Sequence, residues 1–241
     1  MRGLASTLVV IAALLPLAAC GQNVAPQSRQ SRSRDVATTS STPTYDAAML
    51  AAAEPFEKLT ETAFSGSPDT LDVTIGEVND AAGRVRRTMT GNVVLRLDER
   101  LADIAAARKS GDRAELAIAA VEGYRVLVSA VSGGGIVPIA VNLLDYAGFR
   151  YDADLKAQPT RWADMTQAAL VGREQWTLIS SRVADPSLRA KMDTILGEMA
   201  AAVQGRNASS AAAASQLELA LVDDLETYFK SKKAVEPATD E

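Results

Sequence analysis

The stretch WADMTQAALVGREQWTLISSRV, residues 162–183, carries the clearest helical pattern in the chain. Its apolar and small residues recur at alternating spacings of three and four: Trp162, Met165, Ala169, Gly172, Trp176, Ile179 and Val183. This spacing places them on one face of an α-helix. Asp185 and Pro186 follow and end the pattern, because the residue before a proline avoids the helical conformation. The stretch predicts an amphipathic helix packed against other helices.

The same spacing recurs over most of the chain, in 49–63, 71–89, 94–104, 117–131, 137–155, 188–202 and 217–228. Ser67 and Pro68 predict the start of the second of these helices. Near Gly91 the pattern changes register, which predicts either a kink or a helix boundary. No stretch alternates at period two, as a half-buried strand would. The sequence therefore predicts an all-α fold, an antiparallel bundle of about seven helices, built as one bundle or as two packed sub-bundles.

The N-terminal segment has the layout of a secretory signal, with Arg2 before an apolar run over 8–15 and small residues leading to Cys20. Its end, Leu17-Ala18-Ala19-Cys20, resembles the lipobox of bacterial lipoproteins. This resemblance, which covers residues 1–20 only, implies that 1–19 are removed and that Cys20 is lipidated through its sulfur. The alternative is a plain cleaved signal that contains a cysteine.

The residues after Cys20 are expected to tether a folded domain to a membrane. Gly21 stands where the enterobacterial sorting rule would place Asp for inner-membrane retention, so the resemblance favours the outer membrane, with the protein facing the periplasm. Residues 20–44 are rich in Ser, Thr, Gln and Arg and predict a flexible linker. Residues 45–241 form the predicted helical-bundle domain. Cys20 is the only cysteine, so no disulfide forms within the chain.

Composition excludes several classes of function. Residues 45–241 hold 21 basic and 29 acidic residues, a net charge of −8, which argues against nucleic-acid binding. The chain has no histidine, which removes Ser-His-Asp and Cys-His nucleophile systems and the zinc-protease motif. Eleven aromatic residues in total are few for the carbohydrate cleft of a carboxylate-based glycosidase. We therefore expect no enzymatic activity and no required cofactor.

The stretch VNLLDYAGFRYDADL, residues 141–155, contains two candidate ligand residues. Asp145 and Asp152 lie two turns apart on one border of an apolar helical face. Gly148 on that face permits the close approach of a helix or a ligand. The two carboxylates either hold a cation or bind helix ends and arginines from neighbouring helices.

Glu218 is the sharpest anomaly, because it projects into the predicted apolar face of the last helix, formed by Leu217, Leu221, Leu225 and Tyr228. A buried carboxylate must be paired, ligated or protonated. The expected partners are Arg125 or Arg150, or a metal ion shared with Asp145 or Asp152. Glu57 has a similar setting in the first helix and completes a candidate cluster of four acids. The alternative is a rotated helix with Glu218 at its rim.

Three aromatic residues are candidate pocket residues: Tyr151, Trp162 and Trp176. The alternative for each is a place in the core, with the indole N–H bonded to a buried acceptor.

Three functions follow as expectations, in this order. The first is a membrane-anchored, non-enzymatic interaction or scaffold module, whose partners are the bilayer through Cys20 and an envelope protein. The second is a periplasmic protein that binds a small ligand or a hard cation through carboxylate and Tyr oxygens. The third is a carboxylate-based enzyme.

Overall fold

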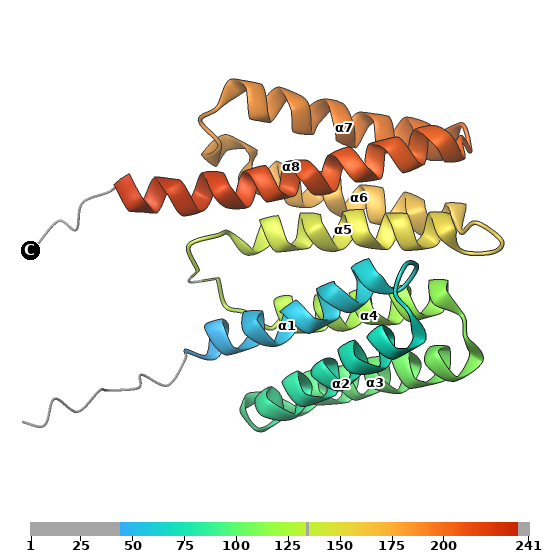
Figure 1. Ribbon diagram of the computed structural model, residues 1–241. Helices are drawn as coiled ribbons and strands as arrows, with labels where there is room; N and C mark the ends of the chain where they lie inside the picture. Colours follow the sequence, from blue (N-terminus) through green and yellow to red (C-terminus); the bar gives the residue numbers. More distant parts are fainter. Residues whose placement is uncertain (1–43, 134, 236–241) are drawn as a thin grey trace, which may run out of the picture. The chain divides into compact units, whose positions relative to one another are not determined.

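The computed structural model describes residues 44–133 and 135–235, and this part is built of helices without strands. The predicted signal peptide, Cys20 and almost all of the linker lie outside the described residues. The α-helices are α1 (Tyr45–Thr62), α2 (Pro68–Val85), α3 (Gly91–Ser110), α4 (Arg113–Val128), α5 (Ile139–Lys156), α6 (Trp162–Ile179), α7 (Pro186–Gln204) and α8 (Ala208–Val235) (Figure 1). The all-α prediction is confirmed. None of the described helices combines the length and apolar character of a membrane span.

The ambiguity at Gly91 is resolved as a helix boundary. A short 3-10 helix, Arg86–Thr88, ends α2, and α3 begins at Gly91, which gives eight α-helices in the described part instead of about seven. Ser67 caps α2 as predicted, because its Oγ accepts a hydrogen bond from the Thr70 N–H at 3.1 Å and Pro68 occupies the first turn. Local capping chemistry thus sets the start of this helix.

The helices pack around two hydrophobic cores that share α5. The first core is formed by α1 to α4, with Tyr146 and Ala153 contributed from α5. The second is formed by α5 to α8, and its α5 members are Ala140, Val141, Leu144, Tyr151 and Leu155. Helix α5 contacts α4, α6 and α8 extensively and α1 more locally. Helix α5 therefore contributes side chains to both cores (Figure 1).

Candidate functional site

Glu218 is a fully buried carboxyl group on α8. Its exposed fraction is 0%, and neither carboxyl oxygen has a hydrogen-bond partner in the described part of the chain. Burial, followed by repulsion from Asp145, raises the pKa of Glu218 well above its usual range. Glu218 therefore holds its proton to a higher pH than an exposed glutamate does.

The burial of Glu218 follows from the orientation of α8, which differs from the prediction. The buried stripe consists of Ala211, Ala214, Ser215, Glu218, Val222, Leu225 and Phe229. Leu217, expected on that face, is 55% exposed, and Leu221 and Tyr228 are only partly buried. Small residues at the start of α8 let this stripe pack closely, and the stripe is centred near Glu218. The alternative that placed Glu218 at the rim is wrong.

Gly148 of α5 provides the space that the Glu218 side chain occupies. A Cβ atom added at Gly148 would lie 2.0 Å from Glu218 Oε2 and 2.7 Å from Leu219 Cδ2. Any side chain at this position would collide with α8, so the close approach of the two helices requires glycine here.

A row of polar positions on α5 leads away from this contact. Asn142, Asp145 and Gly148 are spaced three residues apart and therefore share one helical face. The Tyr124 hydroxyl of α4 is hydrogen-bonded to Asp145. Burial, followed by repulsion from Glu57, raises the pKa of Asp145 well above its usual range. Asp145 thus connects Glu218 electrostatically with the acids on α1.

The row ends at a cavity of about 450 Å³, which we call the acidic cavity. Its lining residues are Leu50, Ala53, Glu54, Glu57, Tyr124, Gly135, Ile136, Val137, Asn142, Glu226 and Lys230. Burial, then repulsion from Glu61, Glu226 and other nearby acids, raises the pKa of Glu57 to about 7. Asn142 Oδ1 is buried and has no hydrogen-bond partner in the described residues. The cavity therefore presents oxygen atoms that can accept further hydrogen bonds.

The cationic side chains near Glu57, Asp145 and Glu218 are engaged by other partners. Lys230 at the cavity is paired with Glu226 at 2.5 Å. Arg150, an expected partner of Glu218, instead contacts Glu122 at 2.5 Å and Asp154 at 2.9 Å. Arg125, the other expected partner, donates to the Tyr146 hydroxyl at 3.1 Å. The prediction that one of these arginines pairs with Glu218 is wrong, because both belong to a network between α4 and α5.

The structure brings together three of the four acids of the predicted cluster and leaves one apart. Glu57, Asp145 and Glu218 form an electrostatically linked series, whereas Asp152 is paired with Lys156 at 2.5 Å, one turn along α5. In the part of the chain described here, no three acidic, histidine or cysteine side chains converge as a metal site would require. The linked acids come instead from α1, α5 and α8, and of the three only Glu57 lines the acidic cavity.

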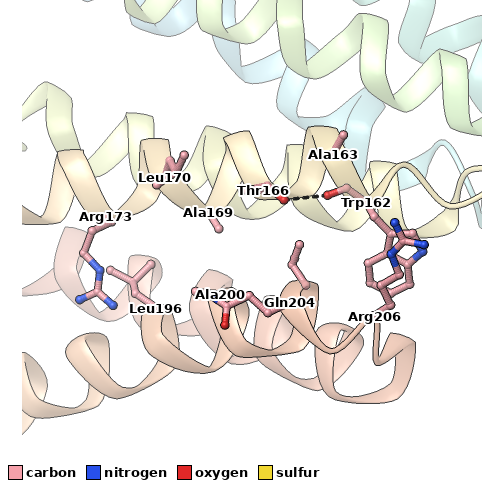
Figure 2. A pocket seen from close by; sticks show the side chains of 11 residues that line it. Trp162, Ala163, Thr166, Ala169, Leu170, Arg173, Leu196, Ala200, Gln204 and Arg206 are labelled. Carbon is pink, nitrogen blue, oxygen red and sulfur yellow. Dashed lines mark hydrogen bonds between the residues drawn. The ribbon is translucent and has the colours of Figure 1, made fainter.

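The three candidate aromatics have separate surroundings. Tyr151 is fully buried, and its hydroxyl donates to the Met199 carbonyl oxygen at 3.0 Å. Trp176 is buried, and its indole Nε1 donates to Asp193 at 2.7 Å. Trp162 lines a different cavity, between α6 and α7 (Figure 2). They do not form one aromatic box.

Sequence reasoning missed a buried ionic network around Arg150. Asp154 is 0% exposed and accepts from Arg150, and Tyr146 donates to Glu122 at 2.8 Å. Burial is the largest cause that raises the pKa of Asp154 to about 6, in opposition to Arg150. The spacing of four between Arg150 and Asp154 is a usable signal in the sequence, since such residues face each other on a helix.

No protein-family model, curated protein or solved structure matches the chain.

Proposed function

We propose that the chain is a lipid-anchored, non-enzymatic binding protein of a bacterial cell envelope that holds a small organic cation in the acidic cavity. The ligand class is an alkyl amine, with one or more ammonium groups on a methylene skeleton. One observation carries the proposal. Glu57 lines the acidic cavity and is linked electrostatically through Asp145 to the buried Glu218, and no cationic side chain is paired with these three acids in the described residues.

The electrostatics favour a positively charged ligand. The linked carboxyls have raised pKa values because they are poorly solvated and repel one another. An ammonium group would supply both an opposite charge and hydrogen-bond donors, which stabilise the ionised carboxylate. The free acceptor Asn142 Oδ1 offers a further contact to an N–H group.

The remaining lining residues suit an alkyl skeleton. Leu50, Ala53, Ile136 and Val137 add apolar surface to the lining that holds the carboxylates. A volume of about 450 Å³ lies within the range of small-molecule sites, which combine apolar walls with a few placed polar groups. An amine with a methylene chain uses both parts of this lining.

The N-terminal sequence supports the location. The lipobox-like Leu17–Cys20 would anchor the chain, and a linker of the length of residues 20–44 spans on the order of 25–30 Å as a flexible coil. That distance lets the helical domain sample the periplasmic space. The outer membrane is the proposed site of the anchor, on the basis of Gly21.

Thermal unfolding of residues 21–241 at pH 8, with 1,4-diaminobutane or with the neutral 1,4-butanediol, tests the proposal. Every contact described above lies within 44–235, so this chain retains the site. Only the diamine should raise the midpoint, because a ligand of the folded state stabilises it by mass action. Glu57→Gln should abolish the rise, whereas Asp80→Asn, which removes one exposed charge on α2, should keep it. Equal shifts with the diol, or an unchanged shift in Glu57→Gln, would refute the proposal.

A further inference from the structure

A second cavity lies between α6 and α7, in the part of the fold that holds the second core. It has a volume of about 370 Å³. Its lining residues are Trp162, Ala163, Thr166, Ala169, Leu170, Arg173, Leu196, Ala200, Val203, Gln204 and Arg206. We call it the α6–α7 groove. Figure 2 shows side chains of both helices on its two sides, with Arg173 near one end and Arg206 beside Trp162 at the other.

The body of the α6–α7 groove is apolar. Ala169, Leu196 and Val203 are buried core residues that also line it, and Leu170 is 51% exposed at its edge. From Trp162 to Arg173 the groove follows α6 over eleven residue steps, which corresponds to a helical rise of about 17 Å. An apolar lining of this length fits an extended alkyl chain.

The ends of the groove have a charge opposite to that of the domain. Residues 45–241 carry a net charge of −8, yet the groove is lined by two arginines and by no carboxylate. Arg173 approaches Asp193 only at 4.0 Å. Among the described residues, no ion pair is formed by Arg206. A guanidinium group in this setting complements an anionic headgroup, with which it forms paired hydrogen bonds.

The backbone of Arg206 ends α7 in a Schellman motif. Its φ of 47° lies in the left-handed region, where non-glycine residues are uncommon. A left-handed residue just past the C-cap is a common way to end a helix. Here the α7–α8 turn fixes it through hydrogen bonds from Arg206 N to Val203 O at 3.0 Å and from Asn207 N to Ala202 O at 2.9 Å. This turn places the Arg206 guanidinium group beside Trp162 at one end of the groove.

We infer that the α6–α7 groove binds a monomeric long-chain fatty acid, with its alkyl chain along the apolar lining and its carboxylate on Arg206. This site is separate from the acidic cavity and does not depend on the proposed amine.

Binding of dodecanoate to residues 21–241, below its micelle concentration, tests the inference by calorimetry and by Trp fluorescence. Dodecanoate should bind and change the fluorescence, and the fluorescence change should disappear in Trp162→Phe, because Trp162 lines the groove. Dodecanol and dodecylammonium should bind at least about tenfold more weakly, since a hydrogen bond between charged groups contributes roughly 1.5–3 kcal/mol.

Arg206→Gly is the decisive variant. Glycine accepts a φ of 47° without strain, so the variant should keep or raise the unfolding midpoint while it weakens dodecanoate about tenfold or more. Ala200→Phe should fill the groove and block binding, and Arg96→Ala, an exposed arginine on α3, should change nothing. Equal affinity for dodecylammonium, unchanged binding in Arg206→Gly, or binding only to vesicles or acidic amphipathic peptides would overturn the inference.

Discussion

Glu218 combines three properties that rarely coincide in one carboxyl group. It is fully buried, both of its oxygens lack a partner in the described chain, and the partly buried Asp145 repels it. A glutamate in this state can exist either as the neutral acid or with a cation supplied from outside. In the absence of a ligand, folding therefore binds a proton that the unfolded chain has released.

This proton makes stability depend on pH, and the sign is defined. The pKa of Glu218 is raised in the folded state, so its contribution to the free energy of unfolding falls as pH rises above the unfolded value near 4.5. The decrease is at most about 1.4 kcal/mol per pH unit for each such group. We expect Glu218→Gln to reduce the decline in stability between pH 5 and pH 8, measured by urea unfolding.

The matched control is Glu174→Gln, which removes a charge from the exposed face of α6. It should keep the pH dependence of the unmodified chain. If Glu218→Gln had the same slope as Glu174→Gln, the side chain of Glu218 would be ionised and solvated in solution.

Glu57 provides a second pH-dependent property, the affinity for an amine. Its pKa of about 7 means that the ligand-free cavity is partly protonated at neutral pH, and a bound ammonium must displace that proton. Alkyl amines stay protonated over this range. Affinity for 1,4-diaminobutane should therefore increase from pH 6 to pH 8, by up to about tenfold per pH unit for each proton released. Calorimetry in buffers of different ionisation enthalpy would count the protons released. A pH-independent affinity would contradict the role of Glu57.

At the scale of helices, glycine sets the distance between α5 and α8. We expect Gly148→Ala to destabilise the fold by about 1–3 kcal/mol, since its Cβ would overlap Glu218 and Leu219 and force a shift in a packed core. Gly76→Ala on the exposed face of α2, where nothing lies within 4 Å, should instead stabilise by roughly 0.5–1 kcal/mol. Urea unfolding measures the change in the free energy of unfolding for each variant. The two changes have opposite signs if α5 and α8 approach closely in solution, and the same sign if they do not.

The contact between α4 and α5 depends on Arg150. Arg150→Met would leave Asp154 fully buried without its donor and would also release Glu122. Removal of one partner of a buried ion pair costs about 3 kcal/mol or more. Arg96→Met, on the exposed face of α3, should stay within about 0.5 kcal/mol of the unmodified chain. Equal effects of the two substitutions on the free energy of unfolding would show that the network contributes little.

For the molecule as a whole, helical periodicity predicted the fold class and the capping of α2. It could not decide between a kink and a boundary at Gly91, because both interrupt the apolar stripe in the same way. Helical periodicity also misplaced the buried face of α8. Leu217 and Val222 belong to two stripes with nearly equal apolar content, and the stripe of Val222 is the buried one because Ala211 and Ala214 pack on that side.

The candidate site was predicted only in part. The pattern along one helix indicates which of its side chains are buried, but it does not show which side chains of other helices they contact. The position of Glu218 on its helix was enough to identify a buried carboxyl group. The choice of partner for Arg150 depends on which helices are neighbours, and the sequence does not contain that information in a local pattern. The same reason explains why Asp152 was grouped with Asp145, although Lys156, one turn further along α5, binds Asp152.

The position of α5 between the two cores determines the order in which backbone amides become accessible to solvent. An amide in α5 can exchange its hydrogen for deuterium only when the packing on both sides has opened, whereas α2, which packs chiefly on α1, is released by a local fluctuation. Deuterium uptake should therefore be slowest in α5 and should follow the free energy of global unfolding there. Since Asn142, Asp145 and Gly148 all lie on α5, an occupant of the acidic cavity would slow exchange in both halves of the domain at once.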